Sequence, residues 1–360
     1  MSALDKIRIA GFKSIRDQTV ELRALNVLIG ANGAGKSNFI GVFRLLNDIV
    51  RQNLQLSVGL SGGASRILRL GSKITPTLKL DFYFGKKTYT CHLSHTSDDG
   101  LAFSFENASF FGEGFSDLGA GHRETRILQK VAEKGPGSIP GQILSGIESW
   151  KVFHFHDTSA EARVKRTTQI YDNHSLRSDA ANLAAFLFML RGVHPHYYRQ
   201  IVDVIRLAAP FFRDFVLRPN PLNPETLRLE WQEASVDDFY FDVSSMSDGL
   251  LRFICLATLL LQPDLPSTIL IDEPELGLHP YAVNLLVDLV RGAASRTQVI
   301  LCTQSAAIVD QVDPEDIVLV EREGGESTFR RPARERLASW LEDYSLGELW
   351  QKNVLSAVGK

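Results

Sequence analysis

Hydrophobic and polar positions divide the first part of the chain into short strands and one helix. Residues 6–29 predict two strands around a turn, the second of which is the apolar run 24–30. Residues 36–52 carry hydrophobic side chains at helical spacing. Residues 78–95 alternate hydrophobic and polar positions across a Gly-Lys-Lys turn, which predicts a β-hairpin. The glycine-rich stretch 100–120 gives no clear pattern.

The rest of the chain alternates between helical and strand patterns. Residues 122–134 predict a helix that ends at Gly135-Pro136-Gly137, and residues 150–156 predict a strand. Helices over 178–190 and 196–209 follow, and they are too short for a long coiled-coil arm. The remaining predicted elements are strands at 215–218, 226–231, 239–243, 268–271 and 298–302, helices at 250–261 and 280–291, a hairpin of 316–321 with 327–330 around Gly324-Gly325, and a helical tail over 333–355.

Residues 30–37 read Gly-Ala-Asn-Gly-Ala-Gly-Lys-Ser and match the pattern G-x-x-x-x-G-K-[ST] at every position. In this pattern, backbone N–H groups and a helix N-terminus surround a phosphate. We expect Lys36 to bridge the β- and γ-phosphates of ATP, and Ser37 to bind Mg²⁺. The other loop residues expected to contact the nucleotide are Gly30, Asn32, Gly33, Ala34 and Gly35. A glycine-rich turn without a ligand is the alternative, but the strand before the loop and the helix after it favour the phosphate site.

An acidic pair follows the apolar strand at 268–271. Asp272 comes directly after this strand, where its carboxylate can hold Mg²⁺ through water. Glu273 is placed to polarise the attacking water as a general base. The alternative is an acidic turn without chemistry, and the complete phosphate motif upstream favours a catalytic pair. Glu275 is expected to be a carboxylate at the entry of the next helix.

Composition and charge limit the function classes. The 360 residues include 39 Lys and Arg against 42 Asp and Glu, so the net charge of −3 excludes a generally cationic nucleic-acid coat. The longest apolar run has nine residues, at 253–261, whereas a membrane-spanning helix needs about 20. Three scattered cysteines and an N-terminus without a signal-peptide core favour a soluble protein of the cytoplasm with no disulfide framework.

Four segments together resemble a known family. They are residues 12–17 (FKSIRD), 30–38 (GANGAGKSN), 244–253 (SSMSDGLLRF) and 269–280 (ILIDEPELGLHP). These segments are similar to those of the ATP-binding-cassette (ABC) ATPases of DNA maintenance, in particular the RecF-type and SMC-like ATPases and the stand-alone bacterial group called AAA_21. The resemblance spans nearly the whole chain, from Ile7 to Leu355, and is loose over about residues 55–150.

The resemblance implies an α/β fold, that of a P-loop NTPase of the ABC ATPase head type. A mixed β-sheet core, an antiparallel β subdomain, a short helical insert and no long coiled coil are expected. We expect a single ATPase domain over residues 1–360. Its parts are an N-terminal lobe at 1–165, the helical insert at 166–214 and a C-terminal lobe at 215–360.

The resemblance also implies a homodimer in which two ATP molecules lie between the subunits. Each nucleotide then contacts the phosphate loop of one subunit and the signature of the other, here Ser247, Asp248 and Gly249. A plain helix N-cap is the alternative for this segment, since Ser and Asp favour that position. Lys13 and Asn38 are further implied nucleotide contacts. Residues 60–63 (LSGG) spell a transporter signature, but they lie too far upstream of the acidic strand and predict a loop.

Two positions depart from the family pattern. The switch position after strand 298–302, which many such ATPases fill with histidine, is Gln304. Glutamine can hydrogen-bond the γ-phosphate but cannot carry a proton, so slow or partner-dependent hydrolysis is expected. No glutamine stands clearly in the loop that usually senses Mg²⁺, where His156 and Asp157 are weak candidates.

Histidine pairs and basic clusters give weaker signals. The pairs His154/His156 and His194/His196 lack the further ligands that zinc needs, so ordinary polar positions are favoured. Three basic clusters are candidates for a phosphate backbone, although a solvated surface is favoured for each. They are Arg123, Arg126, Lys130 and Lys134; Arg163, Lys165 and Arg166; and Arg330, Arg331, Arg334 and Arg336.

Three functions remain open from the sequence. The first is an ATP-hydrolysing homodimer that acts on DNA in repair, maintenance or defence, through local basic patches. The second is a regulatory ATPase whose output is a partner effector, such as a nuclease or toxin of a bacterial defence system. The third, a transporter's nucleotide-binding subunit, is disfavoured by the FKS segment and the Ser-Asp-Gly signature. A GTPase is disfavoured because no N-K-x-D segment occurs.

Overall fold

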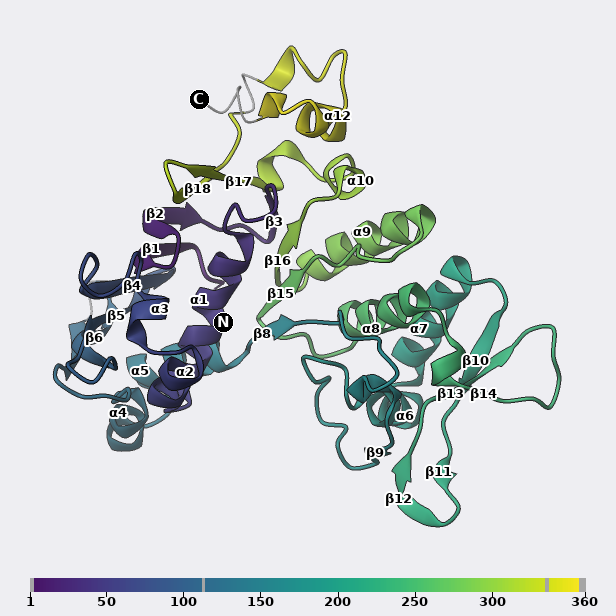
Figure 1. Cartoon of the computed structure of the whole chain (residues 1–360). Coiled ribbons are helices and arrows are strands. Elements are labelled where there is room, and N and C mark those ends of the chain that lie inside the picture. Colours follow the sequence, from purple (N-terminus) through teal and green to yellow (C-terminus); the bar gives the residue numbers. More distant parts are fainter. Residues whose placement is uncertain (1–2, 112–113, 334–336, 356–360) are drawn as a thin grey trace. The chain divides into compact units, whose positions relative to one another are not determined.

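A computed structural model describes residues 3–111, 114–333 and 337–355 of the chain (Figure 1). The chain divides into two compact units. Unit 1 comprises residues 1–152, 266–270 and 297–360, and unit 2 comprises residues 153–265 and 271–296. The fold is mixed α/β, as the resemblance implies. The two units are described in turn.

Unit 1 contains a six-stranded antiparallel sheet in the order β2-β1-β4-β5-β6-β7. Its strands are β1 (Lys6–Phe12), β2 (Ile15–Glu21), β4 (Thr77–Phe84), β5 (Lys87–His95), β6 (Leu101–Phe110) and β7 (Gly114–Gly119). The β4–β5 hairpin confirms the alternation seen in the sequence. The glycine-rich stretch forms β6 and β7, where side chains alternate between the sheet's two faces.

A second sheet of unit 1 has the order β18-β17-β3-β16-β15-β8. Its strands are β3 (Leu25–Ile29), β8 (Trp150–Phe153), β15 (Thr268–Asp272), β16 (Gln298–Thr303), β17 (Ile317–Glu323) and β18 (Glu326–Arg330); the final residues of β8 and β15 belong to unit 2. Strand β3 pairs in parallel with β16 and β17, whereas β17 and β18 form an antiparallel hairpin at Gly324-Gly325. The sheet is therefore mixed, and the first 29 residues form three strands rather than the two predicted.

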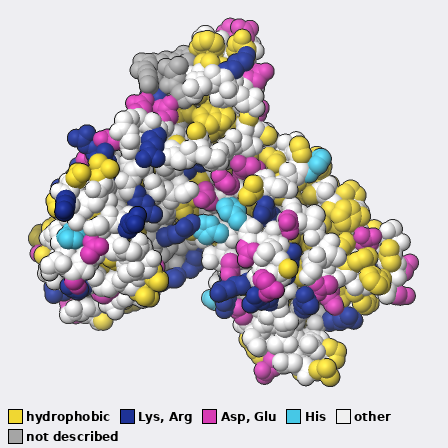
Figure 2. Space-filling model, in the orientation of Figure 1, with side chains coloured by type: hydrophobic (Ala, Val, Ile, Leu, Met, Phe, Trp, Pro, Cys, Tyr) yellow, Lys and Arg dark blue, Asp and Glu magenta, His cyan; other side chains and the backbone are white. Residues whose placement is uncertain are grey.

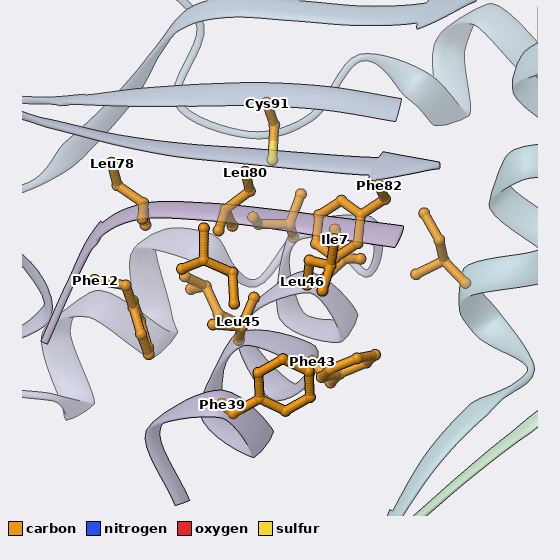
Figure 3. Close-up of a cluster of buried hydrophobic side chains, with 14 of the residues drawn as sticks. Ile7, Phe12, Phe39, Phe43, Leu45, Leu46, Leu78, Leu80, Phe82 and Cys91 are labelled. Atoms are coloured by element: carbon orange, nitrogen blue, oxygen red, sulfur yellow. The ribbon is translucent and has the colours of Figure 1, made fainter. Parts of the chain in front are cut away.

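Helix α1 (Lys36–Val50) supplies much of the core of unit 1 (Figure 3). Its apolar stripe faces the antiparallel sheet, so that Phe39 and Phe43 lie in one cluster with Ile7 and Phe82, all fully buried. Trp150 completes the cluster, with its ring 5.5 Å from that of Phe43. Burying each such side chain contributes about 1.5–3 kcal/mol, which makes this cluster a major source of stability.

The described part of unit 1 also contains short helices and a 3-10 turn. They are α2 (Leu54–Leu60), α3 (Ala64–Ile67), α4 (Ile127–Lys134), α5 (Ile139–Glu148), α10 (Ala306–Val309), η3 (Pro314–Asp316) and α12 (Leu346–Gln351). Residues 61–63 turn the chain after α2, so the LSGG stretch heads no long helix. Helix α12 begins at a capping box formed by Ser345 and Glu348 and packs on α10.

Unit 2 combines helices with two small antiparallel sheets. Its sheets have the orders β10-β13-β14 and β11-β12-β9. Its elements are η1 (Arg163–Lys165), β9 (Thr168–Gln169), α6 (Leu183–Val193), α7 (Pro195–Ala208), β10 (Phe212–Val216), β11 (Pro219–Asn220), β12 (Asn223–Leu227), β13 (Glu230–Glu233), β14 (Phe241–Asp242), η2 (Val243–Ser245), α8 (Asp248–Leu261) and α9 (Pro280–Ala294). Helix α8 packs between α7 and α9. Trp231 stacks on Phe212 and Phe241 and fills the first sheet's core.

Helices α6 and α7 fall within the predicted insert at 166–214, and the division into lobes stays a prediction. Helices α6 and α7 have 11 and 14 residues, so the described part of the chain contains no long coiled coil, as predicted. A search of the same residues found no helix with the length and hydrophobicity that a membrane span requires.

Three predicted helices begin later or extend less far than expected. The helix predicted at 122–134 begins at Ile127, because residues 122–126 bind a buried carboxylate instead. The helix predicted at 178–190 begins at Leu183, since Asn182 holds the loop before it through three hydrogen bonds. The tail predicted at 333–355 is helical at 337–338, over α12 and at 354–355, with turns at 339–343 and 352–353, and residues 334–336 lie outside the described part.

The carboxylate that interrupts the first of these helices belongs to Glu106, which is fully buried in β6. It accepts hydrogen bonds from Tyr89 Oη at 2.6 Å, from His122 Nε2 at 2.8 Å and from the N–H of Arg126 at 3.1 Å. The Thr125 hydroxyl is a further donor. Burial and the nearby carboxylate raise the pKa of the Tyr89 phenol, so Tyr89 stays a proton donor. The cluster fastens residues 122–126 to the sheet.

We expect Glu106→Ala to lower the free energy of unfolding by about 3–5 kcal/mol, because its buried donors lose their shared acceptor. Urea unfolding followed by tryptophan fluorescence measures the change. Glu133→Ala is the matched control, since Glu133 makes an exposed ion pair with Lys130 and its loss is expected to leave the unfolding midpoint in place. Equal effects of the two substitutions would contradict a structural role for the buried cluster.

Candidate functional site

The phosphate loop of unit 1 runs from the end of β3 into α1. Gly35 caps the helix at a φ of 124°, and Gly33 has a φ of 76°, both in the region that favours glycine. The Lys36 side chain is buried, and its ammonium donates to the carbonyl oxygens of Gly30 at 2.5 Å and Ala31 at 3.2 Å. The loop is thus closed on itself, with a helix N-terminus behind it, which is the geometry that binds phosphate.

A hydroxyl from the other end of the chain fastens this loop. Ser327 Oγ, in β18, donates to the Ala34 carbonyl at 2.5 Å and lies 2.6 Å from Ser14 Oγ. Asn38 Nδ2 donates to the same Ser14 oxygen at 2.7 Å. A Cβ on Gly35 would overlap the Ser327 hydroxyl, so this position requires glycine. Sequence reasoning missed Ser327, because nothing around residue 327 resembles a nucleotide-site motif.

Lys13 lies in the turn between β1 and β2. Its backbone is in the left-handed region, at a φ of 47°, and its N–H donates to the Ile67 carbonyl. The ammonium lies 5.4 Å from the centre of the Phe12 ring. Partial desolvation lowers the pKa of Lys13, and repulsion from Arg44 lowers it further. Strained backbone at a charged residue is typical of functional sites.

Gln304 lies at the same sheet edge as the phosphate loop. Strands β3 and β16 pair in parallel with Ile29 opposite Thr303, so the loop and Gln304 leave the sheet at the same level. The sheet therefore brings together two predicted site residues that are 268 positions apart, Lys36 and Gln304. Side chains at the carboxyl ends of neighbouring parallel strands share one edge, which is where α/β proteins bind ligands.

A hollow of about 390 Å³ lies in unit 1, and Glu326, the residue before Ser327, is part of its wall. Its walls include the side chains of Arg16, Arg69, Lys79 and Glu326. Glu326 directly precedes Ser327 in the chain. It pairs with Arg69 at 2.9 Å and with Arg16 at 3.3 Å. Sequence reasoning missed this hollow, because its wall residues come from β1, β2, β4, β18 and the loop after α3.

Asp272 and Glu273 lie in unit 2, at the end of β15. Glu273 has a φ of 43°, an uncommon conformation for a residue other than glycine. His156 Nε2 donates to the Asp272 carbonyl at 2.8 Å, so the weak candidate His156 contacts the acidic segment. Glu275 was expected at a helix entry, and this is wrong, because α9 is capped by His279. Glu275 lies in the turn that precedes this cap.

The signature segment, also in unit 2, begins helix α8. Ser247 is the N-cap, and its hydroxyl accepts a hydrogen bond from the N–H of Leu250 at 3.3 Å. Asp248 is the first helical residue, with its side chain 64% exposed. A Cβ on Gly249 would overlap the Gly277 carbonyl, so glycine is required where α8 meets the turn after β15. The N-cap geometry is present, and a phosphate role for the segment stays a prediction.

Arg252 connects three segments of unit 2. Its guanidinium donates to the carbonyls of Phe155 at 3.1 Å, His156 at 2.7 Å and Leu276 at 2.7 Å. One side chain on α8 therefore holds the stretch after β8 and the turn after the acidic pair. Sequence reasoning missed this role, although Arg252 follows the signature by one helical turn.

The basic clusters are neutralised locally. Arg123 pairs with Asp98, Lys130 with Glu133, Arg163 with Asp179, Arg166 with Glu161 and Arg330 with Glu321. The four cations of the first cluster do not lie on one helix face, because Arg123 and Arg126 precede α4. Arg331 donates to backbone carbonyls, and Arg334 and Arg336 lie outside the described residues.

The two histidine pairs do not gather further ligands within residues 3–111, 114–333 and 337–355. No group of three or more His, Cys, Asp or Glu side chains is placed there to hold a metal ion. His154 and His156 have ring centres 6.2 Å apart, and His194 and His196 each contact Tyr197.

Arg252→Met is expected to speed hydrogen exchange at residues 276–278 by about 100-fold, because hydrogen bonds to charged donors contribute about 1.5–3 kcal/mol each. Mass spectrometry of deuterium uptake measures the change. Arg177→Met is the matched control, since Arg177 makes an exposed pair with Asp172 and does not contact these segments. Unchanged exchange in Arg252→Met would contradict the bracing role.

Comparisons with known proteins agree with this geometry. The model of the AAA_21 family, described as "AAA domain, putative AbiEii toxin, Type IV TA system", matches residues 25–90 and 173–310, more than half of the chain. No curated protein matches the sequence.

Solved structures of SMC heads share the fold. An SMC head bound to the C-winged-helix domain of ScpA matches with a TM-score of 0.59 at 16% identity, over 94% of this chain and 99% of that one. Heads from Pyrococcus furiosus, bound to the C-terminal domain of ScpA, and from Pyrococcus yayanosii match with TM-scores of 0.57 and 0.53 at 16% and 12% identity. Both matches cover 95% of this chain and 99% of the other. The RecF-type assignment stays a prediction. The chain belongs to the AAA_21 family and has the fold of an SMC-like P-loop ATPase head.

Proposed function

We propose that this protein binds and hydrolyses ATP and closes into a homodimer around two nucleotides. The observation that carries the proposal is the closed phosphate loop at the start of α1, with Lys36 buried against the carbonyls of Gly30 and Ala31. The signature segment at the start of α8 supplies a second helix N-terminus, suited to the γ-phosphate of a nucleotide held by another copy.

Within one subunit, the phosphate chain of ATP would lie along the phosphate loop. The backbone from Gly30 to Gly35 and the side chains of Lys36 and Asn38 are the proposed contacts, with Lys13 beside them. We assign the nucleoside end to the hollow of about 390 Å³ in unit 1, because its walls carry hydrogen-bond donors and include Glu326, the chain neighbour of Ser327.

Ser37 and Asp272 are the proposed Mg²⁺ ligands. Hydroxyl and carboxylate oxygens are the donors that Mg²⁺ prefers, so these residues fit the ion. A bound Mg²⁺ would supply positive charge to the phosphate oxygens. Glu273 is assigned as the general base that polarises the attacking water, and Gln304 as the side chain that contacts the γ-phosphate. Because Gln304 cannot take up a proton, we expect slow basal hydrolysis.

The first candidate for the target of the proposed ATPase is DNA, in maintenance or defence. It is supported by the resemblance to DNA-maintenance ATPases. The ion pairs weigh against a broad DNA-binding face, because six described basic side chains of the three clusters have acidic partners. In Figure 2 basic and acidic side chains are interspersed on the visible face of unit 2. DNA contact would then depend on cations that dimerisation brings together.

The second candidate is control of a partner effector protein. Two observations favour it. The description of the AAA_21 family names a toxin and a toxin–antitoxin system, and two of the similar SMC heads are bound to a domain of another protein. The net charge of −3 suits a protein partner at least as well as DNA.

Glu273→Gln, which keeps the size of the side chain and removes the base, is expected to shift from monomer to dimer when ATP and Mg²⁺ are added. The reason is that nucleotide trapped by slow hydrolysis holds the two copies together. Light scattering coupled to size-exclusion chromatography measures the mass. A mass that stays monomeric at millimolar ATP would refute the proposed sandwich.

Two further variants serve as controls in the same background. Lys36→Ala should abolish nucleotide binding, measured by fluorescence of a labelled ATP analogue, and should therefore stay monomeric. Ser247→Arg should still bind the analogue but fail to dimerise, because the arginine fills the space at the start of α8. Dimerisation of the Ser247→Arg variant would remove the signature assignment.

The effect of DNA on the ATPase rate distinguishes the DNA candidate from the partner-protein candidate. If DNA is the target, double- or single-stranded DNA is expected to raise the rate several-fold at 50 mM salt, and the effect is expected to fall steeply at 200 mM. Phosphate release measured with and without DNA at both salt concentrations tests this. A rate that DNA leaves unchanged at both concentrations would favour the partner-protein candidate.

A further inference from the structure

Lys165 is a nearly buried cation beside the signature segment. It ends the 3-10 turn η1 in unit 2, and its side chain is 8% exposed. Its ammonium donates to the Thr158 carbonyl at 2.6 Å and lies 3.8 Å from Asp248 Oδ1. A buried ammonium is costly unless it is paired, so its position beside one carboxylate calls for an explanation.

The neighbouring charged groups have other partners. Arg163 and Arg166 pair with Asp179 and Glu161. Asp157 accepts hydrogen bonds from the Ser159 N–H and hydroxyl, which lower its pKa most, and the charges of Arg166 and Lys165 lower it further. Among the described residues of unit 2, Lys165 is therefore the cation that forms an ion pair with Asp248.

Asp248 has two opposite effects at the start of α8. A carboxylate in the first turn is stabilised by the positive helix end. The same negative charge, next to Ser247 and largely exposed, repels an anion that approaches this helix end. A signature with an unbalanced aspartate is therefore poorly suited to a γ-phosphate.

We propose that Lys165 is a positioning residue that neutralises Asp248 and so lets the signature accept the γ-phosphate of the nucleotide held by the other copy. This inference rests on the proposed ATP sandwich. Lys165 acts through Asp248 and through the Thr158 carbonyl, which fixes the ammonium beside α8. Water reaches the exposed Asp248 carboxylate and partly screens the pair, whereas the buried ammonium keeps a fixed position beside it.

The test uses the full chain carrying Glu273→Gln and measures the ATP concentration that gives half-maximal dimerisation. Lys165→Met removes the charge and keeps the apolar stem, and it is expected to raise this concentration about tenfold or more, which is the effect of about 1.4 kcal/mol of repulsion. Adding Asp248→Asn to Lys165→Met is expected to restore the parental value to within about threefold, because no negative charge then needs compensation. Arg163→Met is the matched control, expected to leave the value unchanged, since Arg163 is exposed and pairs with Asp179.

The outcomes separate the inference from the proposed function. A parent that stays monomeric with ATP overturns both. A parent that dimerises, together with a Lys165→Met defect that Asp248→Asn does not rescue, overturns the inference alone, because a merely structural role of Lys165 predicts that result. If Lys165→Met does not fold, the single variant Asp248→Asn tests the inference. An ATP concentration for half-maximal dimerisation of this variant that is equal to or below the parental value supports the inference, and a tenfold rise contradicts it.

Discussion

The hydrogen bonds that close the phosphate loop are the interaction on which unit 1 depends. They join the Lys36 ammonium to the carbonyls of Gly30 and Ala31, and the Ser327 hydroxyl to the carbonyl of Ala34. A loop of this shape turns several backbone groups away from regular pairing, and each must find another partner. The loop therefore draws on β18 near the end of the chain and, through Ser14, on the turn after β1. The hydrophobic cluster around α1 holds the helix in the orientation that the loop requires.

In unit 2, cationic side chains supply hydrogen bonds to backbone carbonyls that no strand pairs with. Between β8 and α6 the chain has little regular structure, so carbonyls there lack strand partners. Arg252 and Lys165 donate to three of these carbonyls, those of Phe155, His156 and Thr158. Each of these two side chains also has a second partner, the Leu276 carbonyl for Arg252 and Asp248 for Lys165. Charged donors make stronger hydrogen bonds than neutral ones, which suits a segment held by few contacts.

Local signals were enough to predict much of the fold. The phosphate motif, the apolar strand before Asp272 and the hairpin at Gly324-Gly325 lie where the sequence predicts them, because their residues act on near neighbours. Helix starts were less predictable. Glu106 and Asn182 recruit backbone groups that a helical pattern alone assigns to α4 and α6. The roles of Ser327 and Arg252 and the pairing of Lys165 with Asp248 escaped prediction because these partners lie far apart in sequence, and a single sequence does not show which distant residues meet.

The carbonyl oxygens of Gly30 and Ala31 accept the hydrogen bonds of the Lys36 ammonium that a phosphate would also accept. If the loop holds ATP as proposed, binding would exchange one set of oxygens around the ammonium for another. The exchange also favours ligands by their charge, because a neutral nucleoside offers the lysine less than the carbonyls already do. Under the proposed function, these carbonyl contacts therefore help the loop to select ligands that carry phosphate.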